Sequence, residues 1–246
     1  MAPIRLYTQT NNPFSEKVAR GLRLKRLPYE RVVSDDPADV KHWSPVTERL
    51  PVLEVDGERR ADSTAILHWL DELCPEPPLR AGDPRTRAAQ ERLAQWSDSS
   101  LLFYWDRWRA ARYPRPGDEL PANPSLLDSL RSRIERTFGR PPSTLSRVEL
   151  REVEVMEELA KRLDDLVGFL GARPFFYSEK PSIADLSVAG MLHLLGSGPM
   201  PGEALLAERP SLAGHMERME KLTAATPPVA DEGSSPPPVE RAITKP

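Results

Sequence analysis

The chain has 246 residues, of which 29% are charged and 39% hydrophobic, and its formal net charge is −3. This composition is typical of a globular protein with room for two small domains, and no apolar run is long enough to predict a membrane-spanning helix. Charges of both signs are interspersed and form no basic stripe, which argues against nucleic acid as a partner.

The first 76 residues alternate strand and helix patterns. Pro13 suits a first helical position because its φ is already fixed, and an amphipathic helix follows it. The order predicts an α+β thioredoxin-like N-terminal domain, βαβ-ββα with a mixed sheet, over residues 1–76. The expected elements before the hairpin are a strand at 4–7, a helix at 13–24, a strand at 27–33 and a short helix at 39–43.

A proline, a hairpin and an acidic residue beside a serine then follow one another. Val52–Val55 and Glu58–Ala61 flank Asp56-Gly57, a strong hairpin signal. Pro51 cannot donate to a sheet ladder, which leaves two alternatives: an ordinary proline at a strand edge, or a cis peptide that turns the backbone of Leu50 outward. In the second case the Leu50 N–H and C=O are free to bind a peptide-like ligand as an added strand.

Asp62 and Ser63 precede a helix that continues through Leu73 with its apolar residues on one face. The N–H groups and dipole of a helix N-terminus attract a carboxylate, the Ser63 hydroxyl adds a donor, and Asp62 is available for an ammonium group. The zwitterionic end of an amino acid suits this arrangement. The alternative is that Asp62 or Ser63 is only an N-cap.

From Pro84 the sequence changes to long amphipathic segments, which predict an all-α helical bundle domain over residues 84–224. Ser182 and Asp185 form a capping-box-like start, in which the Ser182 hydroxyl caps the N–H of residue 185 and Asp185 reaches back to the Ser182 N–H. This predicts a structural role for Asp185. The expected helices are at 84–112, 146–170, 182–195 and 210–222, with a short helical stretch near 126–138 between prolines.

Residues 225–246 are rich in proline and lack an apolar period, so we expect a disordered tail. The single cysteine, Cys74, cannot form an internal disulfide, and no signal-peptide pattern opens the sequence, so we expect a cytoplasmic location. The four histidines are far apart in the sequence and predict no metal site.

The chain resembles the cytosolic glutathione transferases, with bacterial, plant tau-like or omega-like features, through the segments NPFSEKV, LPYE, SPVTERLPVLEVDG and ADSTAILHWLDEL followed by a helical half. The resemblance implies the two-domain fold of that family and glutathione as co-substrate. It also implies that Leu50, before Pro51, binds the cysteinyl backbone of glutathione, and that Asp62 and Ser63 bind its γ-glutamyl end. Arg49 either contacts the tripeptide, as a basic residue does in tau-like members, or is a surface arginine.

Members of this family ionise the glutathione thiol with a hydrogen-bond donor at the N-terminus of the first helix, where the residue before Pro-Phe is usually Ser, or Cys in the thiol-transfer branch. Here it is Asn12, which disfavours omega-like thioltransferase chemistry but keeps an amide N–H that can donate to a thiolate. Ser15 and Tyr7 are weaker candidates, because Ser15 is expected to be a structural hydroxyl and Tyr7 a core aromatic residue.

The resemblance further implies a second-substrate pocket between the domains that holds a planar, apolar electrophile. The same spacing is also typical of core packing. The candidate residues in the first long helix are Phe103, Tyr104, Trp105, Trp108 and Arg109.

The resemblance implies a function, the conjugation of the glutathione thiolate to a small electrophile. It also implies that the protein forms a homodimer. Because Asn12 replaces the usual Ser or Cys, a non-catalytic interaction or ligand-carrier module is the alternative. Glutathione-dependent isomerisation, dehalogenation and peroxide reduction also stay open, since all three use the same thiolate site. No metal, nucleic acid or membrane is expected as a partner.

Overall fold

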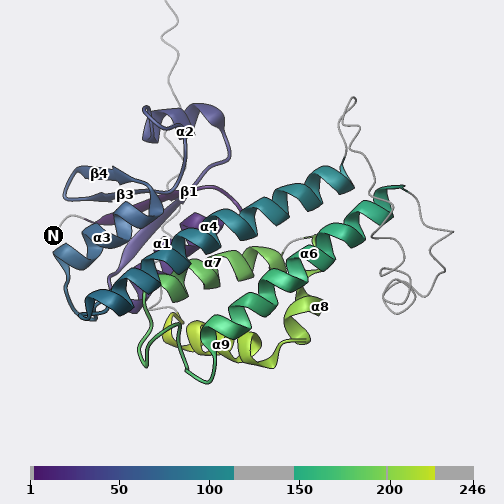
Figure 1. Ribbon diagram of the computed structural model, residues 1–246. Coiled ribbons are helices and arrows are strands. Elements are labelled where there is room, and N and C mark those ends of the chain that lie inside the picture. The colour runs from purple at the N-terminus through teal and green to yellow at the C-terminus, as the bar shows by residue number, and fades with distance from the viewer. Residues whose placement is uncertain (1–2, 114–146, 198, 225–246) are drawn as a thin grey trace, which may run out of the picture.

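The computed structural model describes residues 3–113, 147–197 and 199–224. The expected short helix near 126–138 and the tail at 225–246 lie outside these residues. Within them, a small sheet with three helices is followed by a group of longer helices (Figure 1). None of the described helices is long and apolar enough to cross a membrane.

The sheet has four strands in the order β2-β1-β3-β4. Strand β1 (Ile4–Thr8) pairs in parallel with β2 (Tyr29–Val33) and antiparallel with β3 (Val52–Val55), and β3 forms the expected hairpin with β4 (Glu58–Ala61). This mixed sheet confirms the predicted thioredoxin-like order.

Three helices accompany the sheet: α1 (Pro13–Leu24), α2 (Pro37–Trp43) and α3 (Ser63–Leu73). Helices α1 and α3 lie between the strands and the long helices, whereas α2 lies on the other side of the strands (Figure 1). Helix α2 begins two residues earlier than the sequence pattern predicts. The reason is local, because the Asp36 side chain caps the Ala38 N–H and the proline at 37 suits a first helical position.

The helical half contains α4 (Pro84–Arg112), α6 (Arg147–Leu170), α7 (Ile183–Ser197), α8 (Gly202–Ala207) and α9 (Pro210–Leu222). Most side chains of α7 are buried, and α7 packs against α4, α1, α8 and α9. Helix α7 is therefore the centre of this half. Helix α8 is an addition to the elements expected from the sequence.

The contact between α1 and α7 requires a glycine. A Cβ atom on Gly190 would lie 2.6 Å from the carbonyl oxygen of Pro13 and 3.3 Å from the backbone nitrogen of Lys17. Because both neighbours are backbone atoms that cannot turn aside, only glycine permits this close approach. The first turn of α1 is therefore held against the helical half.

The carboxylate of Asp185 organises the start of α7. It is fully buried and accepts four hydrogen bonds: from the Ser182 N–H and hydroxyl (both 2.8 Å), the Phe176 N–H (2.9 Å) and Nε2 of His215 (2.9 Å). The expected bond from Asp185 to the Ser182 N–H is present. The Ser182 hydroxyl differs from the expectation, because it donates to the Asp185 carboxylate and leaves the N–H of residue 185 uncapped by this side chain.

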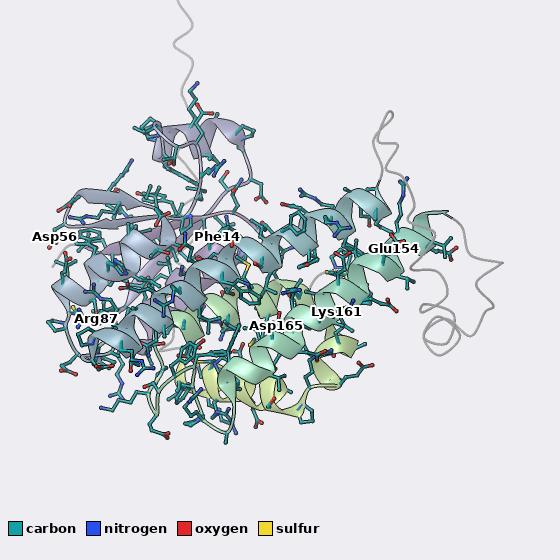
Figure 2. The ribbon with its side chains drawn as sticks, in the orientation of Figure 1. Phe14, Asp56, Arg87, Glu154, Lys161 and Asp165 are labelled. Atoms are coloured by element: carbon teal, nitrogen blue, oxygen red, sulfur yellow. The ribbon has the colours of Figure 1, made fainter. Side chains whose placement is uncertain are left out.

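Replacing Asp185 with alanine is expected to lower the free energy of unfolding by about 3–5 kcal/mol, since four donors would lose a buried charged acceptor. Urea denaturation followed by circular dichroism measures this loss. Asp165→Ala is the matched control, because Asp165 on α6 is half-exposed and pairs with Arg162 at the surface (Figure 2). Equal unfolding midpoints for the two variants would contradict the anchoring role of Asp185.

Candidate functional site

A cleft of about 800 Å³ separates the sheet-containing half from α4. It brings together all five residues that the resemblance assigns to glutathione: Arg49, Leu50, Pro51, Asp62 and Ser63. The wall opposite them comes from α4. Phe14, at the first turn of α1 where that helix meets the long helices (Figure 2), also lines the cleft and packs against the helical core.

The peptide bond between Leu50 and Pro51 is cis. Of the two alternatives for Pro51, an ordinary proline at a strand edge or a cis peptide, the structure has the second. The expectation that both backbone groups of Leu50 are free is wrong for the carbonyl, which accepts a hydrogen bond from Nδ2 of Asn12 at 3.2 Å. No hydrogen bond within the described chain engages the Leu50 N–H. A carbonyl oxygen has two lone pairs, so the Leu50 C=O retains room for a second donor.

The side chain of Asn12 links the N-terminus of α1 to this backbone. Its Oδ1 accepts from the Ser15 N–H at 3.0 Å while its Nδ2 donates to Leu50, so the amide orientation is fixed and one Nδ2 proton is left over. Asn12 itself lines a smaller hollow of about 290 Å³ with His193 of α7. It is therefore connected to the cleft through the Leu50 carbonyl.

Ser15 and Tyr7 lie away from the cleft. Ser15 is fully buried in α1, and its hydroxyl has no hydrogen-bond partner among the residues that the structure describes. The Tyr7 hydroxyl donates to Glu54 at 3.1 Å, and the hydrogen bond from Arg59 lowers the pKa of that glutamate. The Tyr7 ring packs against Trp43 with the ring centres 4.9 Å apart.

Asp62 does cap helix α3. Its Oδ1 accepts from the Thr64 N–H at 3.0 Å and from the Ala65 N–H at 2.9 Å, with φ at 72°, a value that non-glycine residues rarely adopt. Its other carboxylate oxygen makes no hydrogen bond within the described chain, so the ammonium-binding alternative stays open. Ser63 is buried at the first helical position, and its hydroxyl and N–H have no partner in that part of the chain.

A buried ion pair joins the two halves at this cleft, and sequence reasoning missed it. Lys17 of α1 is 1% exposed, and its Nζ donates to Oδ2 of Asp98 at 2.7 Å and to Oγ1 of Thr64 at 2.9 Å. Burial raises the pKa of Asp98, an effect that Lys17 opposes and the nearby charge of Asp62 reinforces. The only sequence signal was a lysine on the apolar face of an amphipathic helix.

The aromatic cluster of α4 does not form one surface of an interdomain pocket. Trp108 is buried and lines a separate cavity of about 640 Å³ between α4, α6 and α8, which shares no lining residue with the cleft. Trp105 and Tyr104 are partly buried against the helical core, Phe103 is exposed, and Arg109 pairs with Asp106 at the surface. Ten residues separate Asp98 from Trp108, which is about 15 Å along the helix.

No cluster of three or more His, Cys, Asp or Glu side chains suited to a metal ion occurs among the described residues. The side chains and backbone groups that line the cleft offer hydrogen bonds and charges. Backbone N–H groups, a hydroxyl and an arginine can bind carboxylates, and Asp62 can bind a cation.

Two protein-family models match the chain: the N-terminal domain of glutathione S-transferase at residues 13–73 and its C-terminal domain at 125–218. A probable glutathione S-transferase of Nicotiana tabacum is 31% identical over 190 residues, covering 76% of this chain and 69% of that protein. Glutathione transferase GST 23 of Zea mays is 36% identical over 107 residues, covering 42% of this chain and 45% of the relative. The alignments span half or less of most of the curated relatives.

A solved structure of a glutathione transferase homologue from Sulfitobacter, with bound glutathione, has a TM-score of 0.62. It covers 91% of this chain and 96% of its own, at 19% sequence identity. This similarity concerns the fold.

Asn12→Ala is expected to lower the free energy of unfolding by about 2 kcal/mol, because it removes both the cap of α1 and the bond to the Leu50 carbonyl. Asp36→Ala is the matched control, since the Asp36 side chain caps α2 through one hydrogen bond and makes no second link. We expect a loss of about 1 kcal/mol for it. Chemical denaturation of both variants tests whether the Asn12–Leu50 bond stabilises the fold, and identical losses would contradict this.

Proposed function

Because the chain belongs to the glutathione S-transferase family, we propose that it binds glutathione in the cleft and joins the glutathione thiolate to a small electrophile. One observation carries this proposal. The same cleft presents the backbone of Leu50 beside Pro51 and the N-terminus of α3 at Ser63. A γ-glutamyl peptide needs both features, a strand-like backbone contact and an anion site.

In the proposed complex, the Leu50 N–H donates to the cysteinyl carbonyl of glutathione. The γ-glutamyl carboxylate lies at the start of α3, where the Ser63 hydroxyl and N–H donate to it and the helix dipole stabilises its charge. The free oxygen of Asp62 accepts from the α-ammonium group. Arg49 pairs with the glycyl carboxylate. The glutathione-bound Sulfitobacter homologue supports this proposal at the level of the fold.

Catalysis in this proposal comes from formation of the thiolate and from proximity. A free thiol has a pKa of about 8.5, and each unit by which the pKa falls stabilises the thiolate by about 1.4 kcal/mol. The remaining Nδ2 proton of Asn12 and the N-terminus of α1 supply this stabilisation. The thiolate then attacks the electrophile, a carbon–sulfur bond forms, and the leaving group departs with the electron pair of its broken bond.

Non-catalytic ligand carriage is the second candidate function. The separate cavity lined by Trp108 favours it, because its volume of about 640 Å³ suits a small apolar molecule and lies away from the cleft. Isomerisation, dehalogenation and peroxide reduction with glutathione use the same proposed thiolate. The homodimer and the cytoplasmic location stay predictions from the resemblance and the composition.

Ser63→Ala is expected to weaken glutathione binding about tenfold or more, since one hydrogen bond to a charged carboxylate is lost. Isothermal titration calorimetry measures the change. Ser99→Ala is the matched control in the same cleft, because the Ser99 hydroxyl is already bonded to the carbonyls of Gln95 and Trp96. Absence of glutathione binding by the unaltered protein at millimolar concentrations would contradict the proposed function.

Asn12→Ala is expected to raise the apparent pKa of bound glutathione, because the thiolate loses a donor while the neutral thiol is little affected. The conjugation rate with an aryl halide should then fall about tenfold at about pH 6.5 and recover toward about pH 9, where the thiol ionises without help. Asn12→Ser keeps one donor and should lose less. If the unaltered protein binds glutathione but conjugates none of a panel of electrophiles, the ligand-carrier function is supported instead.

A further inference from the structure

A second cavity lies in the helical half, between α4, α6 and α8. Its volume is about 640 Å³, and it shares no lining residue with the cleft. Small-molecule sites in proteins have volumes of about 300–1,000 Å³ and combine apolar walls with a few polar groups. The ligand-carrier function leaves open which class of small molecule this cavity suits, and the chemistry of its lining bears on that choice.

One face of α6 forms a side of the cavity. Residues three and four apart on a helix share a face. The residues of α6 that line the cavity follow this spacing: Glu149, Glu152, Val153, Met156, Glu157 and Ala160. This face therefore presents both carboxylates and apolar side chains to the same space.

The other sides of the cavity are largely apolar. Trp108 of α4 is 3% exposed and belongs to the buried core of the helical half, and Leu205 of α8 packs against that core. Pro199 and Pro201 line the cavity from the segment before α8. An aromatic or aliphatic group that enters the cavity would bury its apolar surface against these side chains, which favours binding.

Negative charge dominates the polar part of the lining. Among the described residues, its charged side chains are one guanidinium, from Arg112, and four carboxylates, from Glu149, Glu152, Glu157 and Glu208. This lining would repel an organic anion and attract an organic cation.

Glu152 is the carboxylate best placed to bind a cation inside the cavity. Its side chain is 13% exposed, whereas that of Glu208 is 66% exposed. Nε of Arg112 lies 3.5 Å from Oε1 of Glu152, farther than the about 2.7–2.9 Å of a direct hydrogen bond between charged groups. Burial raises the pKa of Glu152, an effect that Arg112 opposes and Glu149 reinforces. The ionised carboxylate is therefore less stable than in water, and a second cation would stabilise it.

Arg209 is a further cation near this cavity, and its charge is already compensated. Its Nε donates to Oδ1 of Asp164 at 2.8 Å, and its Nη1 lies 3.7 Å from Oε2 of Glu208. Its Nη1 and Nη2 also donate to the carbonyls of Leu205 and Ala160, at 2.7 and 3.1 Å. Because these acceptors engage the guanidinium, Arg209 does not cancel the negative charge of the lining.

We propose that this cavity binds small apolar molecules that carry one ammonium group, with the apolar part against Trp108 and the ammonium group beside Glu152. The inference rests on the ligand-carrier function, the second candidate above, and names its ligand class. It does not depend on glutathione binding in the cleft.

The test is a fluorescence titration with three ligands that share one ring system and differ in charge. Pyrenylmethylamine is a cation at neutral pH, pyrenylmethanol is neutral and pyreneacetic acid is an anion. The amine should bind about tenfold more tightly than the alcohol, because it gains a hydrogen bond between charged groups, and the acid should bind most weakly.

Three variants place the ligand and its charge. Glu152→Gln should weaken the amine about tenfold and leave the alcohol unchanged, whereas Arg112→Gln should strengthen the amine because a competing cation is lost. Glu154→Gln is the matched control and should change neither: Glu154 lies on the same helix (Figure 2), burial also raises its pKa, and it does not line the cavity. Ala204→Trp changes an exposed lining residue and should weaken all three ligands by filling the cavity.

Equal affinity for the amine and the alcohol would overturn the inference, and so would equal effects of Glu152→Gln and Glu154→Gln. Displacement of the amine by glutathione would overturn it as well, because it would place the ligand in the cleft. If Glu152→Gln does not fold, as judged by circular dichroism, the Arg112→Gln and Ala204→Trp titrations carry the comparison. Failure of the unaltered protein to bind glutathione would overturn the proposed conjugation and leave the pyrene comparison intact.

Discussion

The geometry of the cleft depends on one buried cation. Lys17 of α1 reaches Asp98 on α4 and Thr64 on α3, so a single ammonium group holds together the helices that form the cleft walls. Removing either partner of such a pair leaves an uncompensated charge in the interior, and this strongly lowers the free energy of unfolding. The spacing between α3 and α4 at the cleft is therefore fixed before any ligand arrives, and a preorganised site loses less entropy on binding.

Two further constraints set where the first turn of α1 lies. The buried Asp185 carboxylate gathers donors from the segment before α7, from α7 itself and from α9, which positions α7. Gly190 on α7 has no Cβ atom, and this allows the backbone of α1 to pack closely against α7. Through this chain of contacts the packing of the helical half determines the position of Asn12, although Asn12 belongs to the sheet-containing half. Stability and the proposed chemistry are thus coupled through packing.

Most helices and strands could be predicted from the sequence because turns and helix starts depend on residues that are close together in the chain. The Asp56-Gly57 turn, the prolines at the starts of α1 and α4 and the Asp62-Ser63 start of α3 are signals of a few neighbouring residues each. The structure has these elements close to the expected bounds. Contacts between residues that are far apart in the chain could not be predicted from such patterns. The Lys17–Asp98 pair spans 81 residues, and the bond from Asn12 to Leu50 spans 38. For the aromatic residues of α4 the sequence left a substrate pocket and core packing open, and Trp108, Trp105 and Tyr104 pack in or against the helical core. They cannot all face one pocket, since neighbours on a helix point in directions about 100° apart.

The two protons of the Asn12 amide have a consequence for which residues can replace it. One proton is committed to the Leu50 carbonyl, and the second makes no hydrogen bond within the described chain. A serine hydroxyl has a single proton, so a serine at this position must choose between holding the Leu50 backbone and serving a thiolate. Asparagine and serine at this position are therefore not equivalent donors. A serine that served a thiolate would leave the Leu50 carbonyl without the side-chain donor that Asn12 supplies.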